Sequence, residues 1–133
     1  MSLQETGFVT GKEGARIFWQ GFKPSGEIRA LVLISHGLGA HIGRDEHLSV
    51  FLASRGYAVF GSDHRGHGRS DGRRGHILSF EQYLDDYKVF RDSVVERFPS
   101  KKTFLLGHSM GCLIAVHYAL KYPADFSGLV LSS

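Results

Sequence analysis

The stretch that decides the fold is residues 103–121, TFLLGHSMGCLIAVHYALK. It opens with Thr103-Phe104-Leu105-Leu106, a short apolar run typical of a strand buried on both faces of a sheet. Residues 110–121 have the composition of a helix, which is expected to stop near Pro123. Between them lies Gly107-His108-Ser109-Met110-Gly111, a G-x-S-x-G pattern. A buried strand followed at once by a tight turn and a helix predicts parallel strands with crossover helices.

The same alternation of strand and helix signals runs through the chain from about residue 30. Residues 30–35 (ALVLIS), 57–62 (YAVFGS) and 127–131 (SGLVL) predict three further buried strands. Before residue 30, Phe8-Val9 and Ile17-Phe18-Trp19 predict a two-stranded antiparallel lead-in. These elements together predict an α/β fold.

Two further helices are expected between these strands. Ser79 and Gln82 have the spacing of a capping box at the start of the second helix. The apolar residues at helical spacing are Leu48, Phe51 and Leu52 in the first helix, and Tyr83, Tyr87, Phe90, Val94 and Phe98 in the second.

Composition indicates one globular domain over residues 1–133, because 42% of the residues are hydrophobic and 22% are charged. The net charge is +3, and basic residues alternate with acidic ones except in residues 65–74. That segment has four arginines and only Asp71 against them, but no aromatic residue on which a base could stack. We therefore expect a solvated, glycine-rich loop and no nucleic-acid partner.

The sequence also favours a cytoplasmic protein. Cys112 is the only cysteine, so no disulfide forms within the chain and a reducing compartment is compatible with it. The first residues lack the pattern of a signal peptide, and no apolar run approaches the ~20 residues that span a bilayer. Contact with a membrane surface is not predicted either way.

The G-x-S-x-G turn has chemical consequences. The turn brings the positions two before and two after the serine close to neighbouring backbone, so Gly107 and Gly111 avoid a clash there. The hydroxyl of Ser109 is expected to project from the turn, beside the free N–H groups at the start of the following helix. A second N–H donor can come from the loop His36-Gly37-Leu38-Gly39, which follows an earlier strand.

Three motifs together resemble one protein family. His36-Gly37, residues 63–70 (DHRGHGRS) and residues 107–111 (GHSMG) are similar to the monoacylglycerol lipase and lysophospholipase-like branch of the α/β-hydrolases, of the serine aminopeptidase S33 type. The resemblance runs from about Ile28 to Ser133. It implies a mostly parallel sheet with helices on both faces, reaching about the sixth strand of the family fold. The sequence is then expected to be the N-terminal part of one such domain.

The resemblance also implies a mechanism. It makes Ser109 the nucleophile of an acyl-enzyme, with the backbone N–H groups of Leu38 and Met110 as the oxyanion hole and Gly107 and Gly111 as the elbow glycines. The implied substrate is an ester that links one acyl chain to glycerol or a related alcohol. No cofactor is implied. In this family the triad acid and histidine come later in the chain, after a cap segment, so both are expected to be absent from residues 1–133.

The sequence gives less support to other catalytic or metal-binding roles for its polar residues. His108 is a poor general base, because adjacent positions on the turn point in different directions, and His36 is expected to make a structural hydrogen bond. Asp63, His64 and His67 lack a well-spaced third ligand, so no metal site is predicted. Asp63 is expected to accept hydrogen bonds from backbone N–H groups of the loop that follows it. The thiol of Cys112 is expected to pack in the core.

Three hypotheses remain open at this point. The sequence is the N-terminal portion of a serine esterase or lipase, or a non-catalytic truncated chain that needs a partner. A third possibility is another acyl-transfer enzyme or peptidase of the same fold. The apolar strand at residues 127–131 is the last predicted element, and an uncovered sheet edge there would favour pairing with another chain.

Overall fold

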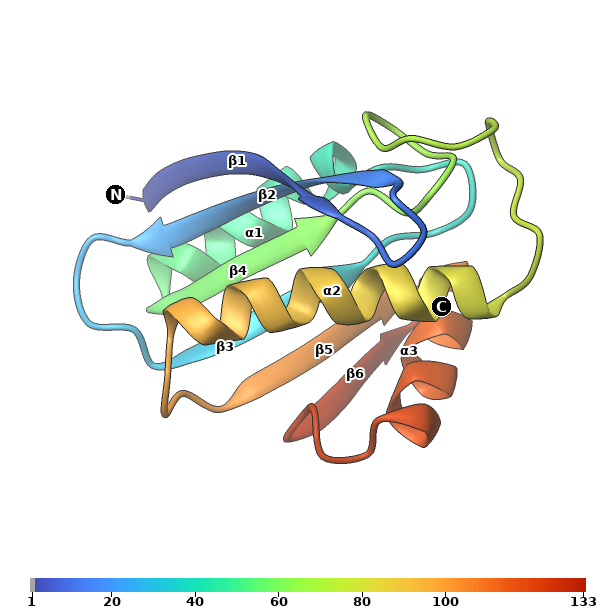
Figure 1. Cartoon of the computed structure of the whole chain (residues 1–133). Helices are drawn as coiled ribbons and strands as arrows, with labels where there is room; N and C mark the ends of the chain where they lie inside the picture. Colours follow the sequence, from blue (N-terminus) through green and yellow to red (C-terminus); the bar gives the residue numbers. More distant parts are fainter. Residues whose placement is uncertain (1) are drawn as a thin grey trace.

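The structure is a computed structural model that describes residues 2–133, and it has a single six-stranded sheet (Figure 1). The strands are β1 (Ser2–Thr10), β2 (Arg16–Pro24), β3 (Ala30–Ser35), β4 (Tyr57–Ser62), β5 (Thr103–His108) and β6 (Gly128–Ser132). The helices are the 3-10 helix η1 (Ile42–Asp45) and the α-helices α1 (Glu46–Ser54), α2 (Glu81–Arg97) and α3 (Met110–Lys121).

The strands follow the order β1-β2-β4-β3-β5-β6. The four strands from β4 to β6 are parallel, whereas β2 pairs with β1 and with β4 in antiparallel register. The predicted mostly parallel sheet with an antiparallel lead-in is therefore confirmed. Strand β5 extends two residues beyond the predicted Leu106, to His108, and β6 begins at Gly128 instead of Ser127.

Helices cover both faces of the sheet (Figure 1). On one face α2 and α3 pack over a core cluster that includes Leu33, Phe60 and Leu105. On the other face η1 and α1 cover a smaller cluster around Ile34 and Val59. Every residue of β3 is buried, since this strand lies between two others and beneath helices on both sides.

The predicted capping box at the start of α2 is wrong. The residue before the helix is Phe80, and no side chain caps the helix there. The Gln82 amide points elsewhere: its Oε1 accepts a hydrogen bond from Leu78 N–H at 2.8 Å, and its Nε2 donates to Glu13 at 2.8 Å. Ser79 contributes only its carbonyl, which accepts from Gln82 N–H. Spacing alone did not reveal that Gln82 ties the helix to the β1–β2 hairpin.

Within residues 2–133, β6 pairs with β5 alone, and its side chains are mostly apolar. Leu129, Val130 and Leu131 are 38%, 52% and 50% exposed. The neighbouring helix α3 also exposes Leu113 and Leu120. Such an edge offers unpaired backbone groups beside apolar side chains, which is the chemistry of strand addition. Association of this edge with another chain stays a prediction.

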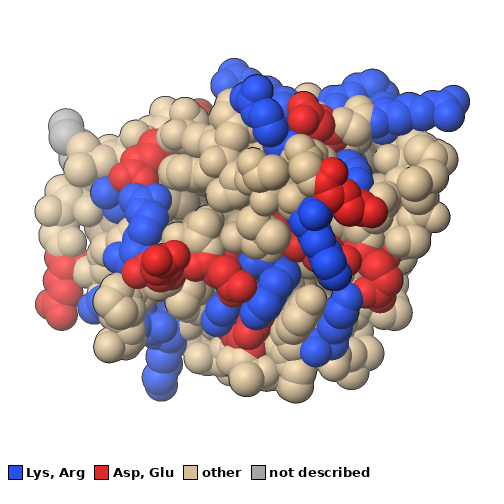
Figure 2. Space-filling model, viewed as in Figure 1, with Lys and Arg blue, Asp and Glu red and all other residues tan. Residues whose placement is uncertain are grey.

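Charges on the face that carries α2 are mixed. Lysines and arginines lie among acidic side chains there (Figure 2). Ion pairs made by α2 include those of Lys88 with Asp125 and of Glu81 with Lys121. Basic side chains gather where Figure 1 draws the loop between β4 and α2, which includes the exposed Arg69, Arg73 and Arg74. No helix of residues 2–133 has the length and apolar character needed to cross a membrane.

Candidate active site

The turn between β5 and α3 is held by close backbone packing. A methyl group placed on Gly111 would lie 1.9 Å from the carbonyl oxygen of Ser35 in β3. One placed on Gly107 would lie 2.6 Å from the carbonyl oxygen of Gly111. Both distances are far below van der Waals contact, so only glycine allows α3 to start this close to the sheet.

Ser109 sits at the tip of this turn in a sparsely populated backbone conformation, with φ 55° and ψ −123°. A non-glycine residue there costs of order 1–3 kcal/mol, and such strain collects at functional sites. Two hydrogen bonds hold it: Ser109 N–H donates to the carbonyl of Ser132 in β6 at 3.0 Å, and its own carbonyl accepts from Cys112 N–H at 2.8 Å. The side chain is therefore presented from a fixed backbone.

A second loop, residues 36–40, lies against this turn. It follows β3 and forms a tight turn in which Ala40 N–H donates to the Gly37 carbonyl at 3.1 Å, with Gly39 at φ 73°. A methyl group on Gly37 would lie 3.3 Å from Ser109 Cβ, so the two loops are in contact. Within residues 2–133, Leu38 N–H is paired with no acceptor.

These two loops line one cavity of about 340 Å³. Its polar side chains include Ser109, His108, Arg44 and Asp45. Burial raises the pKa of the Asp45 carboxyl, and the nearby imidazoles of His108 and His41 oppose that rise. The cavity is lined by Ser109, which carries a hydroxyl, and by Leu38, whose backbone N–H has no partner within residues 2–133. Ser109 directly precedes α3, whose first N–H groups have no partner within the helix. That combination suits attack on a carbonyl and binding of the negative charge that develops on its oxygen.

Within residues 2–133, no histidine or carboxylate makes a hydrogen bond to the Ser109 hydroxyl. His108 Nδ1 lies 3.2 Å from the hydroxyl oxygen of Ser132. His36, His64 and His67 are all buried. His36 makes structural hydrogen bonds, to Gly37 and to the backbone of His64, as the sequence predicted. Sequence reasoning missed its partner His64, which lies 28 residues away in the chain.

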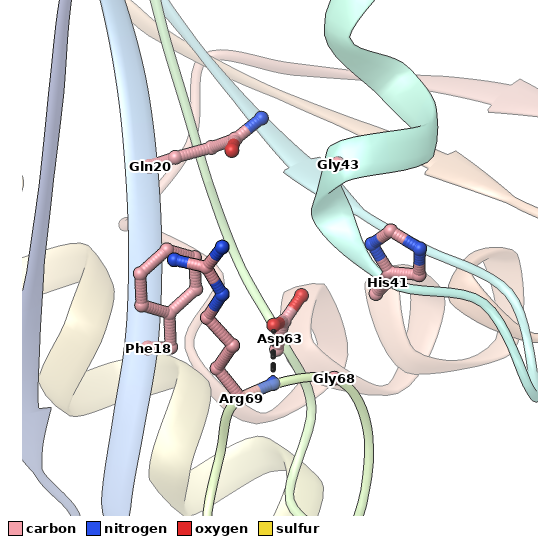
Figure 3. Close-up of a pocket in the computed structure, with 7 residues that line it drawn as sticks. All are labelled: Phe18, Gln20, His41, Gly43, Asp63, Gly68 and Arg69. Carbon is pink, nitrogen blue, oxygen red and sulfur yellow. Dashed lines mark hydrogen bonds between the residues drawn. The ribbon is translucent and has the colours of Figure 1, made fainter.

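Asp63 organises a second cavity, of about 240 Å³ (Figure 3). Its buried carboxylate accepts hydrogen bonds from Ile42 N–H at 2.7 Å and from Arg69 N–H at 2.9 Å. The prediction that Asp63 binds the backbone of the loop that follows it is confirmed for Arg69 N–H, whereas Ile42 belongs to η1, earlier in the chain. The Arg69 side chain turns back over the Phe18 ring, 4.9 Å from its centroid (Figure 3). No metal-binding cluster of histidine, cysteine and carboxylate side chains occurs among residues 2–133.

The expectation of a wholly solvated arginine loop is wrong for Arg65. Its guanidinium makes two hydrogen bonds of 2.8 Å to the buried carboxylate of Asp86 in α2, and a third of 2.9 Å to Glu13. The hydrogen bonds to Asp86 raise the pKa of Arg65. Burial raises the pKa of Asp86, and the hydrogen bonds from Arg65 oppose that rise. A local charge pattern cannot show this pairing, because Asp86 comes from a separate helix. Arg65 therefore ties the loop to the body of the fold.

Cys112 is only half-buried, and its thiol is not wholly enclosed in the core as the sequence suggested. Its Sγ lies 3.2 Å from the Gly107 carbonyl oxygen and 3.0 Å from that of Ser132. The single S–H can donate to either carbonyl, one on each of the strands β5 and β6, and the thiol acts as a small structural group beside the turn.

Comparison with known sequences places residues 26–133 in the family described as "Serine aminopeptidase, S33". The monoglyceride lipase of Homo sapiens is 38% identical over 130 residues, which are 98% of this chain and 43% of that protein. The monoacylglycerol lipase of Mycolicibacterium smegmatis is 34% identical over 122 residues, 92% of this chain and 44% of its own. The chain thus spans less than half the length of these relatives.

Solved structures share the fold. A thermostable carboxyl esterase from Bacillus coagulans, crystallised in complex with glycerol, superposes with a TM-score of 0.89 at 28% identity. The match covers 96% of this chain and 43% of the esterase. The elements that carry the Ser109 turn and the loop of residues 36–40 are thus arranged as in the corresponding part of that enzyme.

Proposed function

The chain belongs to the serine aminopeptidase S33 family of α/β-hydrolases, and we propose that it supplies the nucleophile and the oxyanion hole of a serine ester hydrolase. The observation that carries the proposal is the strained backbone of Ser109 at a glycine-packed turn, beside a loop with an unpaired N–H. The names of its relatives favour a monoacylglycerol-like ester as the substrate.

In the proposed reaction the Ser109 hydroxyl oxygen attacks the ester carbonyl and forms a new C–O bond. The carbonyl oxygen becomes negative and is stabilised by the backbone N–H groups of Leu38 and Met110. Collapse of this intermediate breaks the bond to the alcohol, which leaves with a proton, and the acyl group stays on Ser109. Water then releases the fatty acid.

Serine needs a base to accept its proton during the attack. The proposal assigns this base to a residue outside residues 2–133, because no imidazole in that range hydrogen-bonds to Ser109. It therefore concerns the natural protein that carries this sequence, and it leaves the isolated 133-residue chain inactive.

The test compares hydrolysis of mono-oleoylglycerol by the natural protein and by its Ser109→Ala variant. The variant should lose at least about 10⁴-fold in kcat, as expected when a catalytic serine is removed. Ser54→Ala is a matched control, since that hydroxyl lies at the exposed end of α1 and binds only the Phe51 carbonyl. Full activity of Ser109→Ala would refute the proposal.

Two further measurements separate the alternatives. An aminoacyl anilide tests peptidase chemistry, and preferential cleavage of it over mono-oleoylglycerol would replace the ester assignment with an aminopeptidase. A fluorophosphonate that reacts with activated serines should label the natural protein at Ser109. Failure of a folded natural protein both to label and to hydrolyse any of these substrates would favour a non-catalytic, partner-dependent chain.

A further inference from the structure

We infer that His36 and His64 form a reciprocal pair of positioning residues that aims the Leu38 N–H at the substrate's developing oxyanion. This inference rests on the proposed function, because it assumes that Leu38 N–H is one of the two oxyanion donors. It adds to that function a pair of side chains that act through the Gly37–Leu38 peptide and make no hydrogen bond to Ser109.

The first step concerns one peptide group. The carbonyl of Gly37 and the N–H of Leu38 belong to the same planar peptide unit, and in a trans peptide they point in opposite directions. His36 Nδ1 lies 2.7 Å from the Gly37 carbonyl oxygen, which also accepts from Ala40 N–H at 3.1 Å. Two donors on this oxygen fix the plane of the peptide. They thereby fix the direction of the Leu38 N–H on its other side.

The second step concerns the proton on His36. A carbonyl can only accept, so His36 Nδ1 must carry hydrogen to bind Gly37. His36 Nε2 lies 3.0 Å from the backbone nitrogen of His64, an obligatory donor, so Nε2 must be the lone-pair acceptor. The two contacts are satisfied together only by the neutral Nδ1–H tautomer. The position of the His64 backbone thus selects the tautomer that holds the Gly37 peptide.

The third step closes the pair. His64 Nε2 lies 3.0 Å from the His36 carbonyl oxygen and therefore donates to it, while the two rings lie 4.0 Å apart. Each histidine thus binds the other's backbone, and both side chains are almost wholly buried. The end of β3 is in this way attached to the end of β4 directly beneath the loop that lies against Ser109.

The surroundings keep both rings neutral. The groups that face the pair are the imidazole of His67, the rings of Tyr83 and Tyr87 from α2, the Asp63 carboxylate and the imidazole of His41. Burial is the largest influence, and it lowers the pKa of His36 to about 4 and that of His64 well below its usual value. The hydrogen bonds that need neutral rings are therefore intact at neutral pH.

The test replaces His36 in the natural protein and separates catalysis from binding. His36→Leu removes the donor to Gly37, whereas His36→Asn keeps an amide N–H near the position of Nδ1. Loss of one oxyanion donor lowers turnover about 10²–10³-fold, so misdirecting it should lower kcat by about 10- to 100-fold. We expect KM to change less than about threefold, and His36→Asn to recover most of the lost kcat.

A transition-state analogue supplies a readout that loss of stability would not move. A trifluoromethyl ketone that adds to Ser109 places an oxyanion in the hole, whereas a glycerol monoalkyl ether has no carbonyl. His36→Leu should weaken ketone binding by the same factor as kcat/KM and leave ether binding unchanged. Equal weakening of both ligands would overturn the inference.

His67→Leu is the matched control within the same cluster. The His67 ring lies 5.3 Å from that of His36, but its Nδ1 contacts the Arg65 carbonyl and not the Gly37 peptide. We expect its kcat to stay within about threefold of wild type. If His67→Leu lost as much kcat as His36→Leu, the loss in His36→Leu would have to be assigned to general disruption of the cluster and not to a misdirected Leu38 N–H.

Nitrogen-15 NMR of the unmodified protein gives a result even if the variants do not fold. It should show His36 as the neutral Nδ1–H tautomer at pH 7, and the Nε2–H tautomer would overturn the inference. The proposed function fails separately, through an active Ser109→Ala variant. If Ser109→Ala is inactive but His36→Leu keeps its kcat, the proposed function stands and only the positioning role of the two histidines is refuted.

Discussion

The two loops that meet at Ser109 are held in place by opposite means. The turn of residues 107–111 depends on missing side chains, because backbone occupies the space beside both glycines. The loop of residues 36–40 depends on a side chain, because an imidazole binds its peptide group. The first arrangement appears in the sequence as five adjacent residues, the G-x-S-x-G pattern. The second also needs His64, whose backbone N–H binds that imidazole from 28 positions along the chain, and a contact of this range has no local pattern.

The largest effect should come from Gly111→Ala. Its methyl group would lie 1.9 Å from the Ser35 carbonyl oxygen in β3 and 2.8 Å from that of His36 at the start of the loop that follows. Neither can move without disturbing β3, so we expect a loss of about 4 kcal/mol or more in unfolding free energy. Urea denaturation of the natural protein measures it. Gly26→Ala, where a methyl group meets nothing within 4 Å, is the control and should be nearly neutral.

Lowering the pH should destabilise the folded protein through His36, the side chain that holds the loop of residues 36–40. His36 has a pKa of about 4 in the folded protein and an ordinary value of 6.5 when unfolded, so the unfolded chain binds more protons between these values. Stability is therefore full above pH 6.5 and falls as the pH drops toward 4, by about 3 kcal/mol from this group. Denaturation at pH 7, 6, 5 and 4 tests this. A His36→Asn variant with an unchanged slope would contradict the assignment.

Asp63→Asn tests the support of η1, which follows the loop of residues 36–40, and of the loop that follows β4. The carboxylate accepts from Ile42 N–H and Arg69 N–H, and an amide can offer oxygen to only one of them. We expect a loss of about 1–3 kcal/mol, the cost of leaving a buried donor unpaired. Asp71→Asn is a useful comparison, since its exposed carboxylate binds the single N–H of Arg16. Equal losses at the two sites would argue against a special role for Asp63.

The smallest effect should come from Gly39→Ala, which separates strain from collision. Gly39 has φ 73°, but a methyl group there meets nothing within 4 Å. Only the left-handed backbone conformation is penalised, at about 1–2 kcal/mol. Thermal unfolding of the Gly39→Ala and Gly111→Ala variants, measured in parallel, tests this. A loss at Gly39 as large as that at Gly111 would show that backbone strain, and not collision, governs both loops.

These differences explain which parts of the molecule could be read from the sequence. Strand β3, helix α3 and the turn at Ser109 could be predicted because apolar runs and glycine spacing are local signals. The pairing of Arg65 with Asp86 and the role of Gln82 could not, because each depends on a partner from a distant segment. The capping box failed for the same reason: the Gln82 side chain is used by the β1–β2 hairpin.

The hydrogen bond from Ser109 N–H to the Ser132 carbonyl has a consequence for the order of events during synthesis. The Cys112 Sγ also lies within hydrogen-bond distance of this carbonyl, so two groups at the turn of residues 107–111 share one acceptor in β6. A chain emerging from the ribosome can pair β3, β4 and β5 before Ser132 is available. The turn at Ser109 closes only after β6 has been made and docked. Pairing of β3, β4 and β5 can therefore precede the fixing of the nucleophile, and slow exchange of the Ser109 amide proton would mark the docking of β6.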